Sequence, residues 1–166
     1  MTMQIRELFR HDIDRRIEEV IKVDQTDEAA LRRELEEYIV TDSIRGHYIE
    51  VLEAYNTMRT MPGEGTAVWV SGFFGSGKSS FAKNLGLALE NRSVGGQGAG
   101  DLLATQMSDP RATTLLKLIH EHIPTKAVIF DVSSDRGVHP GQSLTDITYR
   151  VILRELGYSR DRDLAE

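Results

Sequence analysis

The sequence contains no cysteine, only four prolines and few aromatic residues, at 7% of the chain. Without cysteine the chain has no disulfide, no thiolate metal ligand and no thiol nucleophile. Its longest apolar runs are about four residues, at 67–70 and 127–130, whereas a membrane-spanning helix needs roughly 20. The first residues include charged side chains and form no apolar stretch, which excludes a signal peptide. We therefore expect no membrane span.

Charge is moderately acidic, with 26 aspartates and glutamates against 20 lysines and arginines and a net charge of -6. Hydrophobic residues make up 40% and charged residues 28%, a balance typical of globular domains. This composition excludes a disordered tail, a collagen-like fibre and a disulfide scaffold. An acidic chain also disfavours binding to a nucleic-acid backbone over the whole surface, and DNA contact is not evident in this sequence.

A turn-forming cluster at 61–65 divides the chain into two parts. Residues 1–62 are predicted to be mostly helical, with one helix that Asp24 or Thr26 could cap and a second helix after Asp42. Residues 63–166 alternate between strand and helix. The elements predicted there are strands over 66–71 and 126–132, a helix over 79–90, a loop over 93–100, a helix after Asp109 and a last helix capped by Ser143.

The strongest motif is Gly-Phe-Phe-Gly-Ser-Gly-Lys-Ser at residues 72–79, which fits the phosphate-binding pattern G-x-x-x-x-G-K-[ST]. A predicted strand precedes it and a predicted helix follows. Glycines let backbone N–H groups approach phosphate oxygens, and the start of the helix adds its positive dipole end. The motif predicts binding of ATP with Mg²⁺. The predicted binding residues are Gly72, Phe73, Phe74, Gly75, Ser76, Gly77, Lys78, Ser79 and Ser80.

Roles within the motif follow from side-chain chemistry. Lys78 supplies a positive charge to the β- and γ-phosphates, and the Ser79 hydroxyl is a ligand for Mg²⁺. Asp131 ends the apolar run 127–130, as a metal-associated carboxylate would, although a loop-capping role is the alternative. In the loop that follows, Arg136 is a weaker candidate for an arginine finger. The five histidines do not form a metal-ligand set.

A P-loop nucleotide-binding fold needs about five parallel strands with helices on both faces. The sequence offers two confident strands, at 66–71 and 126–132. We therefore predict an α/β fold whose parallel sheet core is incomplete in this chain. The N-terminal helical segment, 1–62, is predicted to pack on this core. We interpret residues 63–166 as the first part of a P-loop NTPase domain that continues in a longer protein.

Two segments resemble the large P-loop ATPases of BREX phage-defence systems, the BrxC/PglY family. One is 5–26, especially 12–15 and 20–23, and the other is 69–79, where two phenylalanines lie inside the loop. The resemblance extends over about residues 5–91. It implies a cytoplasmic bacterial ATPase related to AAA+ and origin-recognition ATPases. It also implies other phage-defence subunits as partners, a homo-oligomer, and an adenine pocket lined by 20–23.

The favoured function is ATP binding and hydrolysis in a phage-defence complex, with Lys78 as the catalytic residue and Asp131 as a second candidate. One alternative is a small-molecule or nucleotide kinase, which would transfer the phosphoryl group to an acceptor other than water. Another is a nucleotide-sensing scaffold without turnover. We expect this chain alone to hydrolyse ATP very slowly or not at all, because an arginine finger is worth about 10³ to 10⁵ in rate.

Overall fold

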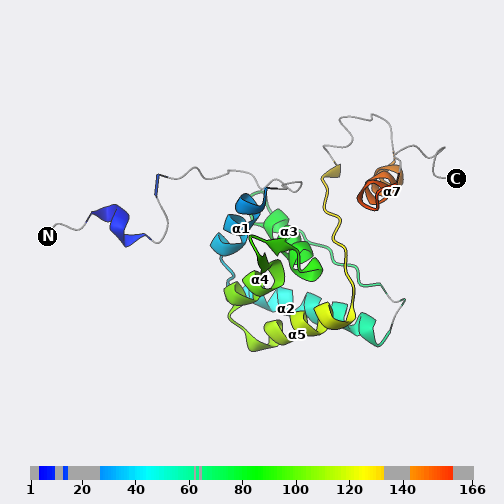
Figure 1. Ribbon diagram of the computed structural model, residues 1–166, viewed down its shortest axis with the longest axis horizontal. Helices are drawn as coiled ribbons and strands as arrows, with labels where there is room; N and C mark the ends of the chain where they lie inside the picture. The colour runs from blue at the N-terminus through cyan, green and yellow to red at the C-terminus, as the bar shows by residue number, and fades with distance from the viewer. Residues whose placement is uncertain are drawn as a thin grey trace.

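The computed structural model describes residues 4–9, 13–14, 27–61, 63, 65–132 and 143–158. Helices α1 to α5 and a small hairpin lie together, as Figure 1 shows. In chain order the described elements are η1 (Ile5–Leu8), α1 (Glu28–Glu37), α2 (Asp42–Asn56), η2 (Thr57–Arg59), α3 (Lys78–Glu90), β1 (Ser93–Val94), β2 (Gln97–Gly98), α4 (Ala99–Met107), α5 (Pro110–His122) and α7 (Leu144–Glu155).

The predicted parallel sheet core is wrong for the described part of the chain. That part is mostly helical, and its one sheet is the antiparallel pair β1–β2, in which Ser93 pairs with Gly98 and Val94 with Gln97. Residues 66–71 and 126–131 have no helical or strand assignment. β-Branched and aromatic residues favour extended backbone, but a strand forms only where a second strand lies beside it. Among the described residues, neither run has such a neighbour.

The burial of the two runs also differs from the prediction. The run 66–71 is exposed, and Trp69 at its centre keeps 91% of its surface accessible. The run 127–130 is half-buried, and Ile129 packs against the core between α1 and α3. Residue type shows that both runs are apolar, but it does not show which elements of the fold cover them.

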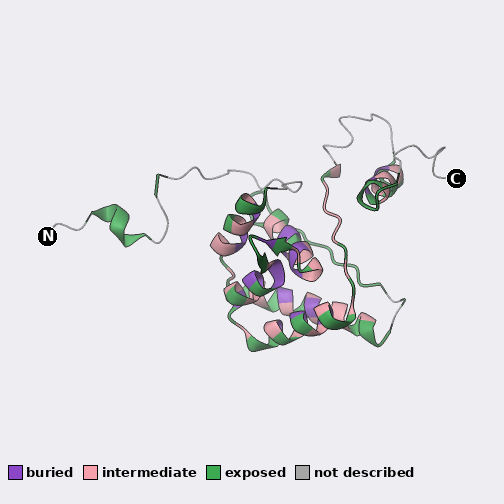
Figure 2. Cartoon of the chain, in the orientation of Figure 1, coloured by how far each residue is buried: buried purple, intermediate pink, exposed green. Residues whose placement is uncertain are grey.

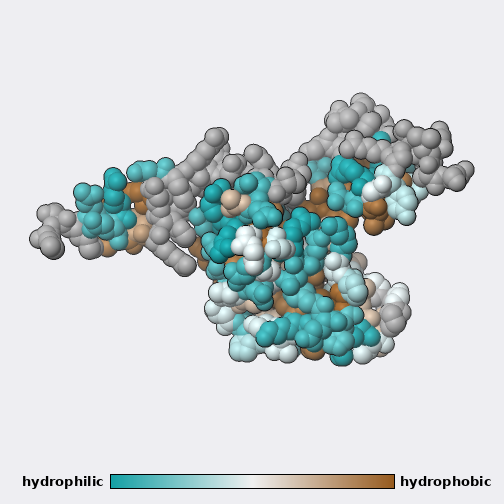
Figure 3. All heavy atoms as spheres, in the orientation of Figure 1, coloured by the Kyte–Doolittle hydropathy of each residue, from teal (hydrophilic) through white to brown (hydrophobic). Residues whose placement is uncertain are grey.

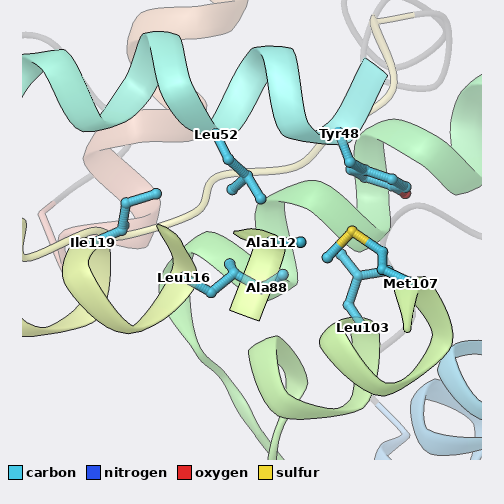
Figure 4. Packing of buried hydrophobic residues seen from close by; sticks show 8 residues of the cluster. All are labelled: Tyr48, Leu52, Ala88, Leu103, Met107, Ala112, Leu116 and Ile119. Atoms are coloured by element: carbon cyan, nitrogen blue, oxygen red, sulfur yellow. The ribbon is translucent and has the colours of Figure 1, made fainter. Parts of the chain in front are cut away.

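The core lies among helices from both sides of residue 62. α2 packs against α5, and α3 packs against α4 and α5. Figure 2 places the buried residues on the facing sides of these helices, and Figure 3 shows hydrophilic residues over most of the visible outer face. The larger buried cluster, drawn in Figure 4, consists of Tyr48, Leu52, Ala88, Leu103, Met107, Ala112, Leu116 and Ile119.

Capping residues start the helices where the sequence indicates. The Asp109 carboxylate accepts from the N–H groups of Arg111 and Ala112, and Ser143 caps α7 in the same way at Asp146. Both caps confirm the prediction. The first helix is capped instead by Asp27, whose side chain accepts from the N–H of Ala30.

The glycine-rich stretch 93–100, predicted as a loop, folds into the β1–β2 hairpin and the start of α4. Gly95 and Gly96 form its two-residue turn with φ of 58° and 80°. A turn with positive φ at both central positions matches the twist of the flanking strands, and glycine adopts it without steric cost. α4 follows directly and was not predicted.

Candidate functional site

The loop 72–77 turns at its glycines. Gly75 and Gly77 have φ of 78° and 84°, in the left-handed region, and Gly72 has φ of 153°. A Cβ at Gly72 would lie only 2.8 Å from the Ser76 hydroxyl oxygen, so no larger residue fits there without a shift. The Ser76 N–H donates to the Phe73 carbonyl at 3.2 Å and closes the turn. Glycine therefore suits this backbone path at all three positions, because each has a positive φ that residues with a side chain rarely adopt.

Helix α3 begins at the end of this loop. Its N-cap is Gly77, and no side chain caps it within the described residues. The first N–H groups of a helix have no intrahelical acceptor, and the helix dipole places partial positive charge at the same end. The start of α3 therefore presents donors and positive potential to an anion. This confirms the predicted helix after the motif, one residue earlier than expected.

Lys78 folds back over the loop. Its Nζ donates to the Phe73 carbonyl oxygen at 2.6 Å, which holds the ammonium against the loop. The Ser79 side chain next to it is exposed. Phe73 and Phe74 are almost fully exposed, at 91% and 99%. The predicted binding residues 72–80 thus form one continuous, accessible surface at the start of α3.

Tyr48 of α2 packs against the first turn of α3. Its ring stacks on Phe81 with centroids 4.2 Å apart, and its hydroxyl donates to the Phe81 carbonyl at 3.2 Å. Tyr48 is fully buried. Burial raises the pKa of the Tyr48 phenol far above its ordinary value, and a hydrogen bond with Tyr38 adds to this. The phenol therefore stays neutral and acts as a structural donor.

A buried ion pair joins α3 to α1. The Lys83 ammonium lies 2.5 Å from a carboxylate oxygen of Glu34, and the lysine side chain is only 1% exposed. Sequence reasoning missed this contact. The available signal was position, because Lys83 lies one turn before the buried Leu87 on the same face of the helix. A lysine on an apolar helix face needs a partner inside the fold.

A groove of about 470 Å³ runs beside α3. Its lining includes Val68 and Val70, the segment 125–130, and Leu85 and Leu89 of α3. The segment that leads into the phosphate-type loop and the segment that leads to Asp131 therefore border the same groove. Asp131 itself is exposed, one residue beyond the lining.

The remaining predicted positions fall elsewhere. Residues 20–23, the predicted adenine pocket, and Arg136 lie outside the described residues. Within the described ranges, no group of three or more His, Asp or Glu side chains could hold a metal ion. Mg²⁺ that arrives with a nucleotide needs no such group, because phosphate oxygens and water supply most of its ligands. A Ser79 hydroxyl beside the loop fits that kind of site.

Comparison with known proteins gives no further assignment. No protein-family model matches the chain, and no solved structure matches it significantly. In the described residues, no helix combines the length and apolar character needed to cross a membrane. The functional interpretation therefore depends on the residues of the loop and their surroundings.

Proposed function

We propose that this chain binds ATP with Mg²⁺ through residues 72–80. The observation that carries the proposal is one local geometry. Three glycines of positive φ turn the loop onto an uncapped helix start, and the Lys78 ammonium lies over that loop. Backbone N–H groups and Lys78 would contact the phosphates. The Ser79 hydroxyl would contribute one ligand to Mg²⁺ when the metal is bound.

Each of these groups suits a polyphosphate. Backbone donors at a helix start bind anions without desolvating a fixed charge, and the helix dipole adds to the attraction. On phosphate binding the Lys78 ammonium would exchange a neutral carbonyl acceptor, that of Phe73, for a charged one. The hydrogen bond of the ammonium is charge-assisted in both cases, and the phosphate adds charge–charge attraction. The free loop therefore keeps Lys78 close to the place where it would act.

The proposal does not require the parallel sheet that the sequence suggested. Phosphate contacts come from the loop and the first turn of α3. That turn is held by Tyr48 and by the pair of Glu34 with Lys83. These contacts anchor the loop on the helical core of α1 to α5.

Hydrolysis and cellular role form the wider part of the proposal. We propose that the chain acts as an ATPase component of a cytoplasmic, BREX-type phage-defence complex, with other defence subunits as partners. The resemblance of 5–26 and 69–79 to that family supports this role. Asp131 is the candidate carboxylate for the metal's water shell, and its segment borders the same groove as the segment before the loop.

Calorimetric titration with ATP and Mg²⁺ tests the binding step. Lys78→Ala should weaken affinity by roughly 10- to 100-fold, since a hydrogen bond to a charged group contributes about 1.5–3 kcal/mol. Lys117→Ala is the matched control, because Lys117 is an exposed lysine on α5, away from the loop. The control should bind as the wild type does. Equal affinity of wild type and Lys78→Ala, with circular dichroism unchanged, would rule out the assignment.

A further inference from the structure

Phe73 and Phe74 are adjacent aromatic residues inside the loop 72–77, and both lie almost fully in solvent, at 91% and 99% exposure. Aromatic side chains bury about 150–250 Å² each when they are covered, so the pair offers about 300–500 Å² of apolar surface. The largest apolar patch on a typical soluble protein is of this size, and it is often a binding surface. Packing among the described residues does not account for two phenylalanines at these positions.

The turn 73–76 holds the pair at the surface. The Ser76 N–H donates to the Phe73 carbonyl at 3.2 Å, which joins the fourth residue of the turn to the first. Gly75, the third residue, has φ of 78°. This hydrogen bond and a positive φ at the third position are features of a type II turn. Phe74 is the second residue, at the corner of the turn, and its position there agrees with its exposure.

The same backbone joins the rings to the charge that would bind phosphate. The Phe73 carbonyl oxygen accepts from the Lys78 Nζ at 2.6 Å, and only Cα and Cβ separate that carbonyl from the Phe73 ring. The Cα of Phe74 follows about 3.8 Å further along the chain. A nucleoside triphosphate carries its phosphates at one end and a planar base at the other. A ligand whose phosphates contact Lys78 and the start of α3 can therefore place its base against these rings.

We propose that Phe73 and Phe74 stack on the base of the bound nucleotide, and that the loop therefore takes nucleoside triphosphates as a class. The inference rests on the proposed binding of phosphates at 72–80. Phenyl rings have no hydrogen-bonding group, and every base has a face on which they can stack, so stacking tolerates any base. A site that reads a ligand by hydrogen bonds rejects the wrong one by about 10⁴–10⁵. Stacking on two phenyl rings discriminates far less.

Calorimetric titration of the whole chain tests this inference, with Mg²⁺ and either ATP, GTP, CTP or inorganic tripolyphosphate. The affinities for the three nucleotides should agree within about 30-fold. Replacing both Phe73 and Phe74 with alanine should weaken nucleotide binding by about 5- to 150-fold. The same variant should bind tripolyphosphate as the wild type does, because tripolyphosphate has no base. Phe9→Ala is the control, since Phe9 is an exposed phenylalanine outside the loop, at 58%, and it should change neither affinity.

A second pair of variants separates stacking from general apolar contact. Tyrosine at both positions keeps the aromatic faces and should keep nucleotide affinity, whereas leucine at both keeps apolar surface without those faces and should lose affinity. Wild-type ATP affinity in the alanine or leucine variant would overturn the inference. So would an equal loss for tripolyphosphate, or a preference above about 30-fold among the nucleotides. In each of these cases binding of tripolyphosphate to the wild type would leave the proposed phosphate site standing. If neither ATP nor tripolyphosphate bound the wild type, the proposed function would fail, and this inference with it.

Discussion

Glu34 and Lys83 form an ion pair, and replacing one of them should destabilise the chain much more than replacing the other. Lys83 is 1% exposed, whereas the Glu34 side chain is 21% exposed. Replacing Glu34 with Gln leaves a buried ammonium without this carboxylate. Removing one partner of a buried pair costs about 3–5 kcal/mol. Because Glu34 is partly exposed, we expect Glu34→Gln to lower the free energy of unfolding by about 3 kcal/mol, the lower end of that range.

Replacing the lysine should cost much less. Lys83→Met keeps an unbranched side chain of similar length in the same space and removes the buried charge. The remaining Glu34 carboxylate can take up water through its exposed part. Replacing a buried ionic group with an apolar one of similar volume is often neutral. We therefore expect a loss of about 1 kcal/mol or less for Lys83→Met, and a similarly small loss for the double variant.

Urea unfolding followed by circular dichroism measures these differences, and thermal melts provide a second readout. A chain of this size loses about 2–4 °C in Tm per kcal/mol, so Glu34→Gln should melt about 6–12 °C lower. Glu36→Gln provides a control on the same helix, because the pair of Glu36 with Arg32 is more exposed, at 37% and 39%. It should cost about 0–1 kcal/mol. If Lys83→Met destabilises the chain as much as Glu34→Gln, the reasoning about the buried charge is wrong.

Three further predictions concern the helical core and the loop. Tyr48→Phe removes the hydrogen bonds of the Tyr48 hydroxyl with the Phe81 carbonyl and with Tyr38, and should cost about 0.5–1.5 kcal/mol for each. Tyr48→Ala leaves a cavity and should cost about 3–5 kcal/mol; urea unfolding measures both. Burial alone would raise the pKa of Glu90, but its cationic neighbours, with Lys126 at 2.8 Å, hold it below the ordinary 4.5. A carboxylate with a lowered pKa stabilises the folded state above pH 4.5 and loses this contribution as the pH falls below it. Glu90→Gln should therefore make the free energy of unfolding depend less on pH below 4.5, as measured by urea unfolding at a series of pH values. Gly77→Ala forces alanine into φ of 84° and should lower the free energy of unfolding by about 1–2 kcal/mol. Gly46→Ala inside α2, where a Cβ meets nothing within 4 Å, should raise the free energy of unfolding by about 0.5–1 kcal/mol. Thermal melts should therefore show a lower Tm for the first variant and a higher Tm for the second.

Local signals in the sequence located most helices. Asp109 followed by proline and Ser143 before an apolar-periodic stretch both marked true helix starts. These signals act over three or four residues, so they are readable from sequence alone. The phosphate-type loop is equally local, because its backbone path depends on Gly72, Gly75 and Gly77 themselves.

Features that depend on contacts between residues distant in the sequence could not be predicted from the sequence. The runs 66–71 and 126–132 have the composition of buried strands, but whether a strand pairs depends on a partner distant in sequence. The buried position of Lys83 depends on Glu34, 49 residues away. The hairpin at 93–98 was local, and the Gly95-Gly96 pair could have predicted its turn. Reading the four glycines as a loop missed that signal.

The most direct test of the central claim is a ¹H–¹⁵N correlation spectrum of the whole chain during titration with ATP and Mg²⁺. A chain of 18.7 kDa gives resolved backbone amides, so the binding site can be located as well as detected. The expected result is a saturable shift concentrated in the amides of Gly75, Gly77, Lys78 and Ser79, which in Lys78→Ala needs roughly 10- to 100-fold more ATP to saturate. Saturable shifts confined to residues outside 72–80, or no saturable shift at all, would contradict ATP binding at this loop.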